Sequence, residues 1–447
     1  MNLKALIIDA FALLFFLSAT ALGQVVSEPR REVIPGGPVM KLEDFEAMAQ
    51  QRNPTLAQAD AAIRAAEGRQ RQAGLFPNPV AGYFLEEFAF RSPGETAEQG
   101  AFIEQTIPLG GKLGKARNVF ARERDQAVIV AETQRLRITN SLRVLYFETL
   151  GAQRLVELRS DLSQLAREAV AITKELANVG QADRPDQLQI EIEAERAEIE
   201  FLNAQNDWTR TWQTLAAMAG NPTLAPARLA GNPEDDLVPL NETQLLDTLL
   251  QQSPDLRVAK AGVERARAVV VRERAERVPD LFLRGGLGYS YERFEPVSRS
   301  LAGRRKGLEG RLEVGVNVPI FNRNQGGIAA AEAELAIAER DLERVQLELR
   351  TRFAGSLREY RNAQQMVERY RTQVIPRARE AYQTYLTNFR QMAAAYPQVL
   401  IAQRTLFQVE VEYAQALVRL RERVIGLRGF LLEGGLDPIR GVERNER

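Results

Sequence analysis

The 447-residue sequence predicts a mainly α-helical protein that also contributes strands to a β-barrel, with long antiparallel coiled-coil helices and four strands per chain. Three observations predict this architecture. The chain contains an internal repeat, and each copy carries a long segment with apolar residues at helical spacing. Within each copy, the apolar period also changes from 3.6 residues to two, which is typical of strands.

The first residues have the pattern of a secretory signal peptide. Lys4 precedes an apolar stretch at 5–17, and Ala21-Leu22-Gly23 supplies small residues before a cleavage site. We therefore expect a signal peptide at 1–23 and an N-terminal extension at 24–40. The alternative is an uncleaved membrane anchor, although the apolar run is shorter than the ~18 to 20 residues that a spanning helix needs.

Two motifs occur once in each half of the chain. Asn53-Pro54-Thr55-Leu56 has the counterpart Ser253-Pro254-Asp255-Leu256, and Ile107-Pro108-Leu109 has the counterpart Val318-Pro319-Ile320. We interpret this as a tandem duplication. The first structural repeat is predicted at 41–235, the second at 236–432, and a C-terminal tail at 433–447.

Each repeat is expected to contain a long helical hairpin. No proline occurs between Pro108 and Pro185, and a single helix of this length would extend about 110 Å. After a break at 180–185, apolar residues return at the same spacing, which predicts an antiparallel partner helix. In the second repeat, the outgoing helix is expected from 328 to about 388, with a kink at Pro376, and the returning stripe spans 399–420.

Shorter helices are expected at 42–75 and 254–277, where they can stack on the ends of the returning helices. Trp208 and Trp212 lie on the returning apolar stripe of the first repeat. We interpret both as packing residues rather than as ligand contacts, because a helix buries its apolar stripe against its neighbours.

Strand pairs are predicted within 80–107 and within 281–318. Their expected strands span 80–90, 101–107, 281–294 and 307–318. In the last of these, apolar and charged residues alternate, so they lie on opposite faces of the strand. The apolar set is Leu308, Leu312, Val314 and Val316, and the charged set is Glu309, Arg311 and Glu313. Aromatic residues gather toward the loop ends of the pairs, namely Phe88, Phe90, Tyr289, Tyr291 and Phe294.

Strands of about 9 to 12 residues with one apolar face have the length and pattern of a transmembrane barrel wall. The alternative is a soluble sheet packed on the helices. Four strands leave open edges, which hydrocarbon does not tolerate, so a barrel needs several chains. Two chains close eight strands with a filled interior, whereas three close twelve strands around a channel. The apolar set would then face lipid and the charged set the lumen.

Composition excludes several classes of protein. With 59 basic and 59 acidic residues, nothing in the net charge indicates a nucleic-acid partner. The absence of His and Cys removes the usual base, thiolate nucleophile and soft-metal ligands, so we expect no metal site and no cofactor.

Two short motifs could still indicate an enzyme. Glu86-Glu87 are adjacent strand residues that point to opposite faces, so they cannot flank one bond. Gly110-Gly111-Lys112 lacks the earlier glycine that a phosphate-binding loop requires. We therefore expect no catalysis.

Several motifs resemble the TolC family of outer-membrane efflux proteins. They include Asn53-Pro54 at a helix start and Asn178-Val179-Gly180 at the helical turn. Longer motifs lie around the strands: Gly74-Leu75-Phe76-Pro77-Asn78-Pro79, the stretch 104–112, and the stretch 314–323. The first of these longer motifs and Pro108-Leu109-Gly110-Gly111-Lys112 are most similar to the CzcC branch, which serves heavy-metal efflux. The resemblance covers about residues 40 to 432.

The resemblance implies an outer-membrane channel of a tripartite efflux system in a Gram-negative bacterium. It implies a homotrimer with a twelve-stranded barrel in the lipid and a helical tunnel across the periplasm. It also implies partners, a periplasmic adaptor (membrane fusion) protein and an inner-membrane efflux pump. The adaptor is expected at the tip formed by Asn178, Val179, Gly180 and Gln181.

The tunnel end is expected to be closed at the helix tips, either by a repeated network of charges or by coiled-coil packing alone with the tip charges solvated. Asp186 matches the acidic residue that follows the first tip in the family, whereas Gln398 and Ile401 replace the aperture aspartates of well-known members. The gate candidates are Asp183, Arg184, Asp186 and Arg390. The alternative function is a periplasmic coiled-coil structural or adaptor protein without a pore.

Overall fold

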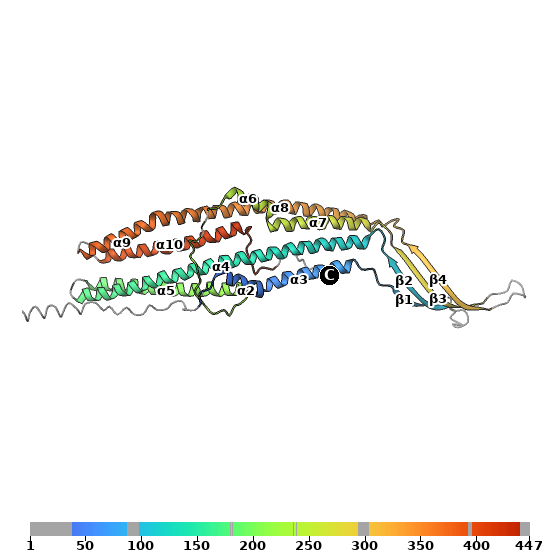
Figure 1. Ribbon diagram of the computed structural model, residues 1–447, viewed down its shortest axis with the longest axis horizontal. Helices are drawn as coiled ribbons and strands as arrows, with labels where there is room; N and C mark the ends of the chain where they lie inside the picture. The colour runs from blue at the N-terminus through green and yellow to red at the C-terminus, as the bar shows by residue number, and fades with distance from the viewer. Residues whose placement is uncertain are drawn as a thin grey trace, which may run out of the picture.

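The computed structural model describes residues 38–86, 98–178, 180, 182–235, 237, 239–293, 304–391 and 396–438. The expected signal peptide and most of the N-terminal extension lie outside these ranges, as do Phe88, Phe90 and Phe294. Figure 1 shows a long rod of helices with a β-sheet at one end. None of the described helices combines the length and the apolar character that crossing a membrane would require.

The first half of the chain contains α2 (Leu42–Arg52), α3 (Pro54–Ala73), β1 (Val80–Glu86), β2 (Glu98–Ile107), α4 (Lys112–Asn178) and α5 (Arg184–Met218). The single helix expected at 42–75 is therefore two helices. The break lies at Asn53, whose side chain accepts a hydrogen bond from the Thr55 backbone N–H at 3.0 Å. Pro54 has no N–H to donate and occupies the first position of the new helix, which it favours.

The second half has the same order of elements. It contains α6 (Glu242–Gln252), α7 (Pro254–Ala275), β3 (Leu281–Arg293), β4 (Arg304–Val316), α8 (Gln325–Arg369), α9 (Ile375–Arg390) and α10 (Tyr396–Arg428). A π-helical segment, Tyr370–Val374, connects α8 to α9. The interruption is where Pro376 predicts it, because proline lacks the N–H and, in a regular α-helix, its ring would clash with the carbonyl four residues earlier.

The sheet is antiparallel with the strand order β1-β2-β3-β4. Its central pair, β2 and β3, joins the two halves of the chain, with Glu104 opposite Arg284. The outer pairs are the two expected hairpins, with Glu86 opposite Glu98 and Arg284 opposite Glu313. β1 and β4 are the edge strands within one chain.

The helical rod is held together by two main apolar clusters. In the first half, Phe45, Tyr146 and Trp212 pack edge to face with ring centroids about 6 Å apart. In the second half, Leu256, Leu349 and residues of α10 form the corresponding core. Trp208 and Trp212 are 6% and 1% exposed, and the Trp212 indole donates to the Leu224 carbonyl at 3.0 Å, so both are packing residues as predicted.

α4 connects the two halves because it packs against α3 and α5 of the first and against α7 and α10 of the second. The chain after α10 strengthens this connection. The Asn140 side-chain amide donates to the Gly429 carbonyl at 2.8 Å, and the Gln134 amide donates to the Gly435 carbonyl at 2.7 Å. The two halves therefore form one continuous rod behind the sheet.

Candidate functional site

One face of the sheet is apolar and uncovered. Leu308 and Leu312 are each 75% exposed, and Val314 and Val316 are 60% and 46% exposed. Neighbouring strands extend the same surface with Tyr83, Leu85, Ile103, Leu283 and Leu287, all of them exposed. An exposed apolar surface that spans four strands indicates a contact with lipid or with another protein.

The opposite face carries charged residues. Glu309, Arg311 and Glu313 are exposed on β4, on the opposite side from the apolar set, as the alternation predicts. The Arg311 guanidinium forms ion pairs with Glu86 at 2.7 Å and with Glu98 at 3.1 Å. Arg284 lies 4.0 Å from Glu313, so several charges on this face are paired.

Phenylalanine rings support these arginines. The Arg284 guanidinium lies 3.8 Å from the centre of the Phe102 ring, and that of Arg311 lies 5.1 Å from the Phe84 ring. A side chain at Gly288 would place a Cβ 2.9 Å from Phe84, so the ring would have to move to accommodate it. Stacking on a ring restricts an arginine and adds a cation–π attraction. The alternation of residues along the strand predicts the charged face, but no sequence pattern predicts the stacking of these arginines on phenylalanine rings.

A largely buried lysine joins the sheet to the helices. Lys112, the first residue of α4, lies 2.8 Å from Asp280 and 3.3 Å from Glu276, in the connection from α7 to β3. The Leu109 backbone N–H also donates to Asp280 at 3.2 Å. Burial alone would lower the pKa of Lys112, but the hydrogen bonds that its ammonium donates to the Asp280 and Glu276 carboxylates outweigh burial and raise that pKa. The Gly-Gly-Lys motif therefore forms a joint between the two halves of the chain.

Both helical hairpins end on the side of the rod opposite the sheet (Figure 1). α4 ends at the expected tip residue Asn178, and Gly180 follows with a φ of 76°, a conformation that glycine adopts without strain. Val179 and Gln181 lie outside the described residues.

The start of α5 is held by local hydrogen bonds. Asp183 caps α5 by accepting a hydrogen bond from the Asp186 backbone N–H at 2.9 Å, and the Arg184 side chain donates a hydrogen bond to Gln187 at 3.0 Å.

The gate candidates divide between the two hairpin ends. Asp183, Arg184 and Asp186 lie together at the start of α5, whereas Arg390 is the last residue of α9. Within the described part of one chain, no ion pair joins Arg390 to either aspartate.

A different ion pair connects the hairpins. Arg404 on α10 lies 2.9 Å from Glu193 on α5, beside a cavity of about 300 Å³ between α4, α5 and α10. These two residues are far apart in the sequence and carry no motif. Sequence reasoning therefore had no signal with which to find them.

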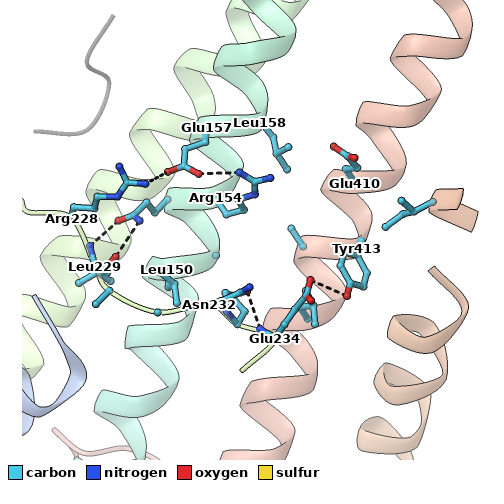
Figure 2. A pocket seen from close by; sticks show the side chains of 18 of the residues that line it. Leu150, Arg154, Glu157, Leu158, Arg228, Leu229, Asn232, Glu234, Glu410 and Tyr413 are labelled. Carbon is cyan, nitrogen blue, oxygen red and sulfur yellow. Dashed lines mark hydrogen bonds and ion pairs between the residues drawn. The ribbon is translucent and has the colours of Figure 1, made fainter. Parts of the chain in front are cut away.

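A cleft of about 620 Å³ lies at the middle of the rod, between α4, α10 and the segment that follows α5 (Figure 2). Glu157 accepts from Arg154 at 3.1 Å and from Arg228 at 3.0 Å. Across the cleft, Tyr413 donates to Glu234 at 3.1 Å, and burial together with the charge of Glu234 raises the pKa of Tyr413 to about 12. The polar groups labelled in Figure 2 mostly satisfy one another, which is typical of a structural joint.

Two half-buried carboxyl groups meet just beyond this cleft. Glu148 on α4 and Glu422 on α10 share a hydrogen bond, and burial raises the pKa of both, helped for Glu422 by the charge of Glu148. Arg210, Arg419 and Arg423 oppose these shifts. In the described ranges, no cluster of three or more acidic, His or Cys side chains is arranged to hold a metal ion.

Comparison with known families identifies the chain. The model of the outer membrane efflux protein family matches residues 47–221 and 245–431, which is most of the sequence. The chain belongs to this family. It is 27% identical over 402 residues to the cobalt-zinc-cadmium resistance protein CzcC of Cupriavidus metallidurans, covering 90% of this chain and 91% of that protein.

Two further relatives and two solved structures extend this comparison. The pyoverdine export outer membrane protein OpmQ of Pseudomonas putida is 25% identical over 84% of this chain and 82% of its own. The nickel-cobalt-cadmium resistance protein NccC of Alcaligenes xylosoxydans is 26% identical over 66% of this chain and 64% of its own. The fold matches CusC with a TM-score of 0.72 at 16% identity, covering 88% of this chain and 92% of that one. It matches VceC of Vibrio cholerae with a TM-score of 0.68 at 21% identity, covering 87% of this chain and 94% of that one.

Proposed function

We propose that this outer membrane efflux protein is the outer-membrane channel of a tripartite efflux system in a Gram-negative bacterium. It conducts substrate from a periplasmic adaptor protein and an inner-membrane pump to the exterior. The observation that carries this proposal is the sheet, which has one exposed apolar face and one charged face at the end of a long helical rod. Such a sheet fits a wall between lipid and a water-filled lumen.

Three copies form the channel. One sheet exposes two edge strands, and hydrocarbon does not tolerate unpaired backbone groups, so neighbouring copies must cover these edges. Three four-stranded sheets close a twelve-stranded barrel that is wide enough for a lumen. Leu308, Leu312, Val314 and Val316 then face outer-membrane lipid, and Glu309, Arg311 and Glu313 face the lumen.

The helical rods of the three copies form a tunnel through the periplasm. The hairpin tip Asn178, Val179, Gly180 and Gln181 docks the adaptor, because the glycine at the tip allows a partner helix to approach closely. Charges around the tips, Asp183, Arg184, Asp186 and Arg390, contribute to closure of the tunnel. Threefold repetition of such charges could hold a gate that single exposed pairs could not. The ion pair between Arg404 and Glu193 supports closure by tying the two hairpins of each chain together.

The proposed cargo is a heavy-metal cation. Two of the relatives are named for resistance to cobalt and cadmium, with zinc or nickel in addition. Deletion of the gene should lower the tolerated concentrations of cobalt, zinc, nickel or cadmium, and a plasmid copy should restore them. If tolerance to organic compounds falls instead while metal tolerance stays unchanged, the cargo is organic. That outcome is the second candidate, since OpmQ is named for pyoverdine export.

Membrane fractionation tests the channel itself. The mature protein should stay with the outer membrane after washing with salt and alkali, and detergent should release it as a trimer. A periplasmic structural or adaptor protein without a pore would extract in aqueous buffer as a smaller species. Purified trimer should also give discrete conductance steps in a planar bilayer, which a protein without a pore cannot do.

A further inference from the structure

The two edge strands of the sheet are joined by an ion pair within one chain. Arg311 is on β4 and Glu86 is on β1, and their charged atoms are 2.7 Å apart. The residue of β1 in register with Arg311 is Gly82, through Gly286 on β3 and Phe102 on β2. Glu86 lies four residues beyond Gly82, so the pair spans the sheet diagonally.

A flat sheet could not form this contact. Three strand spacings separate β1 from β4, which is about 14 Å, and four residues along a strand add about 13 Å in the perpendicular direction. An arginine and a glutamate together do not reach across the resulting diagonal. The sheet must therefore curl toward its charged face. Phe84 on β1 indicates the same curl, because its ring lies beside Gly288 on β3, with β2 between them.

A twelve-stranded barrel requires the sheet to open. Three spacings then cover a quarter of the circumference, so the direct distance between β1 and β4 of one chain is about 13 Å, and the diagonal to Glu86 is about 18 Å. The pair between Arg311 and Glu86 of the same chain would therefore break. In the closed barrel, β4 of one copy lies antiparallel to β1 of the next. Strand alternation keeps both side chains on the charged face, where direct or diagonal neighbours interact.

We propose that this ion pair is exchanged when the trimer assembles. In the free chain, Arg311 and Glu86 draw the two edge strands together and shield them from incorrect pairing, which exposed edges otherwise invite. In the trimer, Arg311 pairs with Glu86 of the adjoining copy and helps to set the register of the seam. This inference rests on the proposed trimeric barrel, and it adds the residues by which the copies recognise one another.

Thiol crosslinking distinguishes the two arrangements, because the chain contains no cysteine of its own. The variant Glu86→Cys with Arg311→Cys is treated with a short bismaleimide, both as the unassembled chain and as the detergent-purified trimer, and is then run on a denaturing gel. The unassembled chain should give a crosslinked monomer of altered mobility. The trimer should give covalent dimers and trimers. The control pairs Glu86→Cys with Leu312→Cys, which lies next to Arg311 on the opposite face and should crosslink in neither state.

The outcomes separate this inference from the proposed function. A trimer that crosslinks only within chains, or not at all, overturns the exchange and leaves the channel intact. An unassembled chain without an internal crosslink overturns the proposed edge contact. A protein that remains monomeric in detergent overturns the trimeric barrel, and the exchange with it. As a second measurement, Arg311→Glu should reduce the trimer fraction at least several-fold, and adding Glu86→Arg should restore it; failure of the swap to restore trimers counts against the seam.

Discussion

Lys112, at the start of α4, forms an ion pair of 2.8 Å with Asp280, which immediately precedes β3. The Lys112 side chain is only 11% exposed and also contacts Glu276. The contact ties the exit from β2 to the entry of β3, at the point where the sheet meets the rod. It therefore fixes how the two halves of the chain leave the sheet together.

Replacement of this lysine should loosen the joint. Lys112→Met leaves two carboxylates without their shared partner and should lower the free energy of unfolding by about 1 to 3 kcal/mol. Thermal unfolding followed by circular dichroism measures the effect. Lys260→Met is the matched control, because Lys260 is an exposed lysine on α7. Equal unfolding temperatures for both variants would show that the joint contributes no stability.

The orientation of the sheet predicts an asymmetric response to new charges. Val314→Arg places a charge on the apolar face and should cost about 2 to 4 kcal/mol if the residue lies near the middle of the membrane. Glu309→Arg, on the charged face of the same strand, should be tolerated. The fraction of protein that runs as folded trimer on a mildly denaturing gel measures both. Equal losses would contradict the assignment of the two faces.

The carboxyl pair Glu148 and Glu422 predicts greater stability in acid. Their pKa values are raised above 4.5 in the folded chain, so the folded state binds protons more tightly than the unfolded state does. This contribution is complete below pH 4.5 and is lost as the pH rises through the folded pKa values. Between pH 4.5 and 8, the unfolding temperature should fall less steeply in the double variant Glu148→Gln with Glu422→Gln than in the unchanged protein. An unchanged slope in that variant would assign the pH dependence to other groups.

The hairpin tip should contact the adaptor in cells. A photo-crosslinking amino acid at Val179 or Gln181 should capture the adaptor, and Gly180→Val should weaken capture because its backbone conformation disfavours a side chain. The comparison site is Glu195, an exposed position farther along α5. Strong capture at Glu195 with none at either tip position would place the docking surface on the helix side.

Conductance separates the two sets of charges proposed for closure. Arg404→Ala removes the pair with Glu193 and should raise the single-channel conductance at low salt, because the hairpins of each chain are then no longer tied. The increase should shrink at 1 M salt, where the screening length is about 3 Å. Asp186→Ala with Arg390→Ala should act in the same way if charges at the tips also contribute. Conductance unchanged in both variants would leave helix packing alone as the gate.

Local patterns determined most of the fold. The 3,4 spacing of apolar residues predicted the long helices, and the alternation around Leu312 and Glu313 predicted the two faces of β4, because each pattern depends only on neighbours in the chain. The motif that contains Lys112 supported the family, but its partner could not be predicted. Asp280 belongs to the other half of the chain, and only the docking of the two halves brings the two residues together.

The sequence by itself determined the long helices, the strands with their two faces, and the family. The tertiary structure decided the contacts between distant segments: Lys112 with Asp280, Arg404 with Glu193, and Arg311 with Glu86. The break at Asn53 belongs to the same group, because its side-chain amide also donates to the Met218 carbonyl at 2.9 Å. A local pattern specifies which face of an element is apolar, but it cannot specify which distant charge that element meets. That choice depends on how the elements pack and on how far the sheet curls.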